Sequence, residues 1–327
     1  MDPVTLTPVD EVRVTTIVDN AYDGLLPDEP SVQRSGIAHR FAAPQFEGGE
    51  TVAGLWAEHG FSALVEVRRG DRVTRVLFDT ALSPDSMLDN ADRMQLRLDT
   101  VQATVLSHGH FDHVGGLLGL ASRFGRAGMP LTVHPQVWTR RRLALPGAGE
   151  TELPTLSRTA LEQEGFDVVE RRDPSLLLDG HLLVTGEVDR TTDFERGMPP
   201  SHQAWDGTAW RHDRLLLDDQ AIVVHVRDRG LVVLTGCGHA GVVNIVRHAR
   251  RLTGVDRLAA LIGGFHLSGP AFAPSIEPTV DALAAWDPDL LVPGHCTGWQ
   301  AQHALAARMP EAWRAGASGS TYVVAAA

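Results

Sequence analysis

Four side chains that commonly bind metal ions lie within six consecutive positions of the 327-residue chain. They are His108, His110, Asp112 and His113 in the stretch ATVLSHGHFDHVGGLLGL, directly after a run that is typical of a buried strand. A strand end followed by a tight loop allows His108 and His110 to face one metal ion. Asp112 and His113 can then turn toward a second ion, so the spacing predicts a dinuclear site.

The residue types also indicate the metal and the reaction. Imidazole and carboxylate ligands suit Zn, Fe or Mn, and Zn is the usual ion on nitrogen and oxygen ligands. Two-metal sites hold their ions roughly 3.5–4 Å apart and clamp a shared water or substrate oxygen. A metal-bound water whose pKa falls to about 7 is a nucleophile at neutral pH. We therefore expect two divalent metal ions, first of all Zn with Fe or Mn as alternatives, and hydrolysis.

The rest of the chain supplies the elements that must position these groups. β-Branched runs predict strands at 12–20, 62–67, 75–80, 103–107 and 131–135, and the helix after the histidines is expected to stop at Gly125. The last third predicts strands at 221–226, 231–236, 257–264 and 289–294, and helices at 241–254, 275–287 and 299–309, with Pro278 in the first turn of the second helix. Alternating strands and helices favour an α/β fold built from crossover units.

Further metal-capable residues follow the predicted strands. The set comprises Asp79, Glu187, Cys237, His239, His266 and His295. Strands joined by crossover units end at one edge of their sheet, and ligands of open sheets bind at that edge. Each histidine alone is more often a satisfied core or surface residue, but together they point to one site.

Two long segments, 25–60 and 140–215, are rich in Gly, Pro and polar residues and predict little regular structure. Long irregular segments within a domain are often lids or substrate loops, while a surface insertion without function is an equal alternative. Aromatic residues there, such as Phe194 and Trp205, either line an apolar substrate pocket or pin the loops to the core. We treat residues 1–327 as a single domain.

Composition limits the partners. The formal net charge of −12 disfavours nucleic acid, which requires a basic face, so we expect a small-molecule substrate. No apolar run reaches the roughly 20 residues of a membrane span and no secretory signal is visible, so we expect no membrane contact and a cytoplasmic location. A homodimer remains open. The absence of lysine removes Schiff-base and P-loop chemistry.

The motif HxHxDH, present as His108-Gly-His110-Phe-Asp112-His113, resembles the signature of the metallo-β-lactamase superfamily. The pieces AEHGFSALVEV, LFDT, VTGEV, TGCGHAGVVNI, GGFHL and PGHCTG are similar to a subgroup related to dihydropterin ribofuranosylaminobenzene phosphate synthase. The resemblance implies an αβ/βα sandwich, in which two mixed sheets pack face to face with helices outside and the dinuclear site lies at the edge between them.

The resemblance also implies roles for single residues. His108 and His110 correspond to ligands of the first metal, and Asp112, His113 and His295 to ligands of the second. Asp79 in LFDT corresponds to a residue that orients the ligands, although Ala81 replaces the usual glycine after this motif.

The chain departs from the family pattern at the third histidine and at the bridging aspartate. Thr-Gly-Glu187 stands at the first place and Thr-Gly-Cys237-Gly-His239 at the second. Either Cys237 replaces the bridge, or His239 supplies a ligand and no protein bridge exists. We favour His239 as ligand, with Glu187 and Cys237 as weaker candidates. His266 is interpreted as a proton donor or as a residue that supports the ligands from behind, although an exchange of roles with His295 is a further alternative.

Together these features predict a metal-dependent hydrolase in which a metal-bound hydroxide attacks a small ester, lactone, amide or phosphoester. Asp112 would hold the second metal and orient the hydroxide, and His266 would assist catalysis. Two other classes remain: a di-iron redox enzyme on the same scaffold, for which Glu187 would suit iron, and a ligand-binding protein with a residual metal site.

Overall fold

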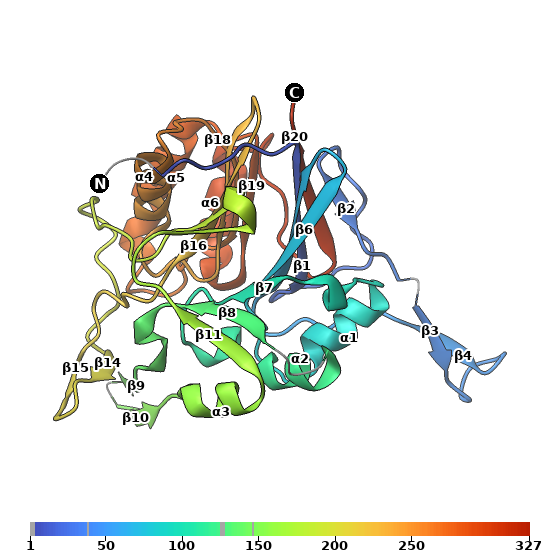
Figure 1. Cartoon of the computed structure of the whole chain (residues 1–327), viewed down its shortest axis with the longest axis horizontal. Coiled ribbons are helices and arrows are strands. Elements are labelled where there is room, and N and C mark those ends of the chain that lie inside the picture. Colours follow the sequence, from blue (N-terminus) through green and yellow to red (C-terminus); the bar gives the residue numbers. More distant parts are fainter. Residues whose placement is uncertain (1–3, 38, 125–127, 146) are drawn as a thin grey trace.

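The computed structural model describes residues 4–37, 39–124, 128–145 and 147–327. Within them, two large β-sheets pack face to face and carry helices on their outer faces (Figure 1). The larger sheet has the strand order β11 (Phe166–Glu170), β8 (Met129–Val133), β7 (Ala103–Val105), β6 (Arg72–Phe78), β5 (Ser62–Arg69), β1 (Glu11–Val18), β20 (Ser320–Ala325) and β2 (Val32–Arg34). The smaller sheet has the order β12 (Ser175–Leu177), β13 (Leu182–Val184), β16 (Ala221–Val226), β17 (Gly230–Thr235), β18 (Leu258–Gly264) and β19 (Leu290–Gly294).

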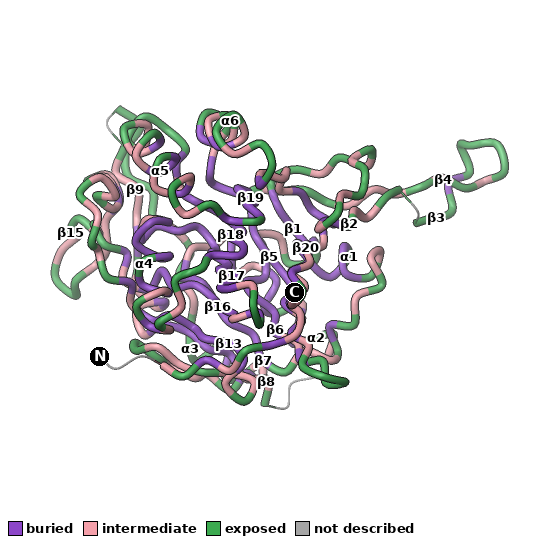
Figure 2. The backbone as a smooth tube through the Cα atoms, turned by 90° about the horizontal axis from the view of Figure 1, so that it is seen from above, coloured by how far each residue is buried: buried purple, intermediate pink, exposed green. Residues whose placement is uncertain are grey.

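Three apolar layers hold the sandwich together. Valine and isoleucine side chains from both sheets form the central layer, which Figure 2 shows as the buried middle of the molecule. The outer face of the larger sheet packs against α1 (Ser86–Arg93) and α2 (Leu117–Phe124). The outer face of the smaller sheet packs against α4 (Val242–Thr253), α5 (Ala273–Trp286) and α6 (Trp299–Arg308). The expected αβ/βα sandwich is confirmed.

The pairing pattern brings the chemically active strand ends together. β6, β7, β8 and β11 are parallel neighbours in the larger sheet, and β17, β18 and β19 are parallel in the smaller one. β16 and β17 form an antiparallel hairpin. Parallel strands expose their carboxyl ends at a common edge, so the residues after β6, β7, β17, β18 and β19 can meet.

Two of the predicted helix boundaries can be compared with the structure. α4 ends at Thr253, and Gly254 adopts the left-handed conformation with φ 68° that glycine tolerates best, as expected. α5 begins at Ala273, so Pro274 occupies its first turn and Pro278 lies inside the helix. The prediction for Pro278 was therefore wrong by about one turn. The predicted stop at Gly125 lies outside the described residues.

The segment 140–215 contains more regular structure than its composition predicted. α3 (Arg158–Gln163) packs beside β11, and a small antiparallel sheet has the order β10 (Gly149–Glu152), β9 (Arg141–Leu145), β14 (His202–Trp205) and β15 (Trp210–His212). These strands lack apolar alternation. Arginine side chains lie over the indole rings of Trp205 and Trp210 and stabilise the small sheet in place of a buried core. The guanidinium of Arg142 lies 4.8 Å from the Trp210 ring centre.

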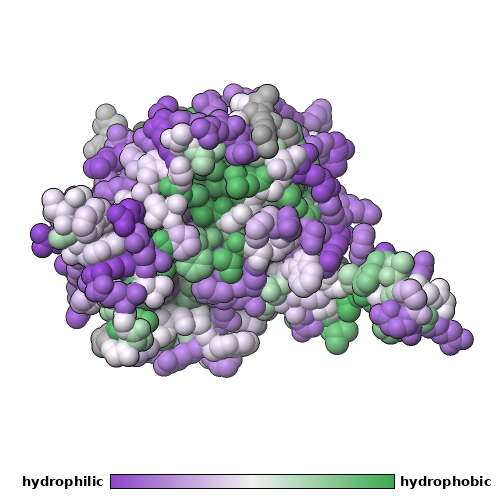
Figure 3. Space-filling model, turned by 90° about the horizontal axis from the view of Figure 1, so that it is seen from below, coloured by the Kyte–Doolittle hydropathy of each residue, from purple (hydrophilic) through white to green (hydrophobic). Residues whose placement is uncertain are grey.

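Within the segment 25–60, β2 joins the larger sheet, and a hairpin of β3 (His39–Ala42) and β4 (Glu50–Ala53) projects from the sandwich (Figure 1). Apolar side chains are exposed on this projection, including Phe41, Phe46 and Val52 (Figure 3). The assignment of both segments as lids or substrate loops stays a prediction. Within the described residues, no helix is both long and apolar enough to cross a bilayer.

Candidate metal centre

Metal-capable side chains gather where the two sheets meet. Among the described residues, three groups place one ligand atom from each member within 4.8 Å of the others. They are His108, His110 and His239; Asp112, His113, Cys237 and His295; and Cys237, His239 and His266. We call the first the imidazole group and the second the thiol group. Cys237 and His239 also belong to the third set, so the two groups adjoin.

In the imidazole group, three ring nitrogens converge. His108 Nε2 lies 3.0 Å from His110 Nδ1 and 3.2 Å from His239 Nε2. Burial, followed by the charges of neighbouring histidines and Arg141, holds the pKa values of His108 and His110 well below their usual range, and burial does the same for His239. The three converging nitrogens of these neutral rings cannot all be satisfied by hydrogen bonds to one another. Ligands of a tetrahedral Zn ion lie about 3.3 Å apart, so this triad fits one ion.

Hydrogen bonds behind the imidazole group fix its ring orientations. Ser107 Oγ lies 2.9 Å from His108 Nδ1, on the side away from the triad. His110 Nε2 lies 3.0 Å from His202 Nε2, which leaves Nδ1 of His110 to face the other imidazoles. The Gly109 amide donates to Asp218 Oδ2 at 2.9 Å. A side chain on Gly109 would place its Cβ 2.4 Å from the Val137 carbonyl oxygen, so the loop requires glycine here.

The thiol group combines residues from the ends of three strands, β7, β17 and β19. Asp112 and His113 lie in a short 3₁₀ turn, Phe111–His113, after β7. His113 Nε2 lies 3.2 Å from Cys237 Sγ, and His295 Nε2 lies 3.4 Å from Asp112 Oδ2. His295 Nε2 is buried and has no well-aligned hydrogen-bond partner among the described residues. A buried nitrogen without a partner is costly unless a ligand occupies its lone pair, so this atom also fits a metal ion.

Outer residues orient the thiol group as well. His113 Nδ1 lies 2.7 Å from Asp79 Oδ2, and His295 Nδ1 lies 3.1 Å from Asn20 Oδ1. Both contacts direct Nε2 toward the centre. Asp79 also accepts hydrogen bonds from the amide and hydroxyl of Ser107, both at 2.7 Å. Asp79 therefore contacts residues of or behind both groups, and its orienting role stays a prediction.

Electrostatics separate the two groups further. Burial opposes charge on the thiol group, but His113 and His295 hold the pKa of Asp112 well below its usual range. Burial likewise opposes charge on His113, yet the carboxylates of Asp112 and Asp79 raise its pKa to about 9. Burial raises the pKa of the Cys237 thiol well above its ordinary value. The thiol group thus favours a cation, either a proton on His113 or a metal ion.

Of the remaining candidates, His266 lies beside the ligand groups and Glu187 does not. The His266 ring lies 4.1 Å from that of His239, beside the imidazole group. Glu187 lies outside all three groups, with Oε1 3.2 Å from His134 Nε2 and 3.3 Å from an Arg172 nitrogen. His266 has φ 45°, a strained conformation of the kind that clusters at functional sites.

Two histidines near the centre were not predicted. His202 comes from β14, in the segment read as irregular, and no motif marked it. His59 stacks on His295 with ring centres 5.0 Å apart, and its Nε2 lies 3.6 Å from Asp112 Oδ2. The motif AEHGF contains His59, so that resemblance was the available signal. Ala81, at the unusual position after LFDT, adopts φ 64°, which a glycine would adopt with less strain.

Comparison with known proteins gives a consistent result. The family described as the metallo-beta-lactamase superfamily matches residues 57–295, well over half of the chain. The 7,8-dihydropterin-6-methyl-4-(beta-D-ribofuranosyl)-aminobenzene-5'-phosphate synthase of Methanocaldococcus jannaschii is 30% identical over 260 residues, covering 76% of this chain and 84% of the relative. An uncharacterized protein of the same organism is 26% identical over 247 residues, covering 76% of this chain and 87% of that protein.

A solved structure shares the architecture. Tm1679, described as a metal-dependent hydrolase of the beta-lactamase superfamily, superimposes with a TM-score of 0.70 at 24% identity, and the match covers 96% of this chain and 99% of that one. This likeness supports the fold, while the family match and the curated relative confirm the resemblance read from HxHxDH and the later motifs. The chain belongs to the metallo-β-lactamase superfamily.

Proposed function

We propose that the protein is a hydrolase that uses two divalent metal ions, first of all Zn, to cleave a small ester, lactone, amide or phosphoester. The observation that carries this proposal is the pair of adjoining ligand groups, because a dinuclear centre requires two sets of ligands that share one cavity. When bound, such ions polarise the oxygen of the scissile group and lower the pKa of a water ligand.

The side chains around the centre suit the remaining tasks. Asp112 contributes the single carboxylate of the thiol group and is nearly buried, so it anchors that end of the site. His266 and His59 belong to neither group and both reach cavities beside the centre. His266 Nδ1 is buried and has no hydrogen-bond partner among the described residues. We assign to His266 the transfer of a proton to or from a leaving group.

A metal and activity assay on paired variants tests the proposal. We expect close to two ions per chain in the wild-type protein. His110→Ala should bind at most one ion and lose turnover on a panel of esters, lactones, amides and phosphoesters by more than about a thousandfold, with an unchanged circular dichroism spectrum. His303→Ala, on the exposed face of α6, is the matched control and should behave as wild type. Wild-type turnover in His110→Ala would refute the proposal.

The named relative supports a second candidate, a synthase reaction. Its name describes a product that joins a dihydropterin 6-methyl carbon to an aminobenzene carrying a ribofuranosyl phosphate. The test is to mix a dihydropterin that bears a leaving group on this methyl carbon with the aminobenzene partner and to look for the joined product by mass spectrometry. Product formation at a rate above that of hydrolysis would favour the synthase.

The position of Glu187 does not favour the redox alternative. Glu187 was its suggested iron ligand, and this carboxylate is paired with His134 and Arg172, away from the ligand groups. We therefore propose the hydrolytic reaction ahead of it.

A further inference from the structure

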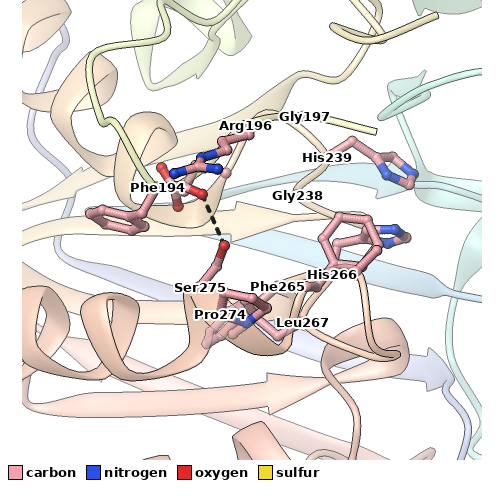
Figure 4. A pocket seen from close by; sticks show the side chains of 14 residues that line it. Phe194, Arg196, Gly197, Gly238, His239, Phe265, His266, Leu267, Pro274 and Ser275 are labelled. Atoms are coloured by element: carbon pink, nitrogen blue, oxygen red, sulfur yellow. Dashed lines mark hydrogen bonds between the residues drawn. The ribbon is translucent and has the colours of Figure 1, made fainter. Parts of the chain in front are cut away.

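A partly open pocket with more apolar than polar lining lies beside the imidazole group (Figure 4). Its volume is about 170 Å³, and we call it the Phe272 pocket. His239 and His266 line one side of the pocket (Figure 4). Its apolar lining residues are Phe194, Phe265, Leu267, Ala271, Phe272 and Pro274. The pocket therefore ends where the proposed reaction would take place.

The walls are held in place by hydrogen bonds and ring contacts. Ser275 Oγ donates to the Phe194 carbonyl oxygen at 2.9 Å, which ties the loop before Met198 to the first turn of α5 (Figure 4). Phe272 packs edge-on against His266, with ring centres 4.5 Å apart. A pocket whose walls are already fixed loses little entropy when a ligand enters, so its shape can select ligands.

The charged residues of the pocket are engaged elsewhere. The Glu195 carboxylate accepts hydrogen bonds from the amides of Val243 and Asn244, at 2.7 and 2.8 Å, and from the Thr192 hydroxyl. The Arg196 side chain is exposed, and its Nε donates to the Asp193 carbonyl oxygen. Among the described residues that line the pocket, His239 Nδ1 and His266 Nδ1 are buried and have no hydrogen-bond partner. The pocket thus fits an uncharged, apolar group that joins a polar group next to His266.

The volume limits the size of that group. An apolar protein cavity of about 150 Å³ binds benzene, so the Phe272 pocket has room for a single six-membered ring. The rings of Phe194 and Phe272 can make edge-to-face contacts with an aromatic guest, whereas Phe265 is only 1% exposed. Two linked rings exceed the space unless Phe272 is shortened.

We propose that the Phe272 pocket binds a single aromatic ring of the substrate, placed next to the bond that is cleaved. This inference rests on the proposed function for the cleavage, but the binding of the ring itself does not depend on turnover. It assigns the substrate class as small aryl esters, amides or phosphoesters and excludes fused or linked ring systems at this position.

Binding of two phenols to the metal-loaded full chain tests the proposal. We expect phenol to shift the amide resonances of Gly238 and Leu267 in a saturable way, and 4-phenylphenol to bind about tenfold more weakly or not at all. Phe272→Ala should admit 4-phenylphenol with an affinity at least about tenfold higher than in wild type. Phe272→Trp should weaken phenol binding by a similar factor. A gain of binding in Phe272→Ala cannot result from misfolding.

Phe41→Ala is the matched control, because Phe41 is 49% exposed on the projecting hairpin and far from the pocket in sequence and fold. It should bind both phenols as wild type does. The proposal is overturned if phenol shifts neither amide, or if both Phe272 variants leave the two affinities unchanged. If phenol binds as expected while the whole substrate panel remains intact, the hydrolase proposal fails and the pocket stands. If esters are cleaved but phenol does not bind, the pocket proposal fails and the hydrolase proposal stands.

Discussion

The imidazole group and the thiol group adjoin each other but are built differently. The imidazole group has three neutral ring nitrogens, two of which come from one loop after β7. The thiol group has one carboxylate, one thiol and two imidazoles, from the ends of β7, β17 and β19. An ion held by neutral ligands keeps its full positive charge, whereas anionic ligands reduce it. We infer that the imidazole group provides the stronger Lewis acid and the thiol group the tighter hold.

Removal of one ligand from each group has the largest expected effect. His239→Ala and Cys237→Ala should each reduce the metal content by about one ion per chain and lower turnover more than about a hundredfold. Metal analysis after dialysis measures the loss. Cys296→Ala removes a buried thiol that belongs to none of the ligand groups and should keep both ions. Two tightly bound ions in Cys237→Ala would show that the thiol is not a ligand.

The pH dependence of metal binding should differ between the groups. The pKa of His113 is raised to about 9, so metal-free protein carries a proton on this ring at pH 7, and the ion must displace it. Affinity of the thiol group should therefore rise about tenfold or more per pH unit from 7 to 9, since the Cys237 proton is released as well. The imidazole group is already neutral at pH 7, and its affinity should stay nearly constant.

Competition titrations with a metal chelator at pH 7, 8 and 9 measure both affinities. Equal slopes in the two groups would contradict the assigned protonation states.

Substitution of Asp79, which supports both groups, should weaken metal binding at both of them. Asp79→Asn keeps the shape of Asp79 but removes the charge that faces His113 and one of the two acceptor oxygens for Ser107. Affinity should fall about 10- to 100-fold at both groups, as is common for residues behind metal ligands. Asp92→Asn, at an exposed ion pair with Arg123, is the control. An effect on only one group would mean that Asp79 does not link them.

The smallest expected effects concern residues that support one group each. His202→Gln should weaken the imidazole group about tenfold, and Asn20→Ala the thiol group by a similar factor. Titration with Co²⁺ separates them, because a cobalt–thiolate charge-transfer band reports the thiol group alone. His202→Gln should leave the midpoint of this band unchanged. A shift of the band in His202→Gln equal to that in Asn20→Ala would remove the distinction.

The sequence was most informative where chemistry is local. HxHxDH is contiguous, so its four ligand candidates could be named without a fold, and the strand-end rule added His239 and His295. His202 could not be found in this way, because β14 reaches the centre by pairing with β9 and neither strand has apolar alternation. The small sheet forms through backbone pairing and arginine–tryptophan contacts, which leave no periodic signal.

Glu187 shows the limit of the strand-end rule. It follows β13, which does end at the predicted edge, but β16 lies between β13 and β17. Neighbouring strands are about 4.8 Å apart, so Glu187 is displaced by roughly 10 Å from the end of β17 and meets His134 instead. The order of strands within a sheet depends on long-range packing, and motif spacing does not encode it. For the same reason the sequence could not tell which aromatic residue reaches the centre: Phe194 lines the Phe272 pocket, while Trp205 and Trp210 pack on each other.

The position of β1 in the larger sheet also affects how the chain folds. β1 pairs with β5 on one side and with β20 on the other, and the Thr15 and Thr321 hydroxyls lie 2.9 Å apart across 306 positions of sequence. During synthesis the β20 side of β1 stays unpaired long after β5 and β6 can form, and an unpaired strand edge invites association with other chains. Contacts of such long range also slow folding. Newly made chains should therefore depend on chaperones until β20 docks.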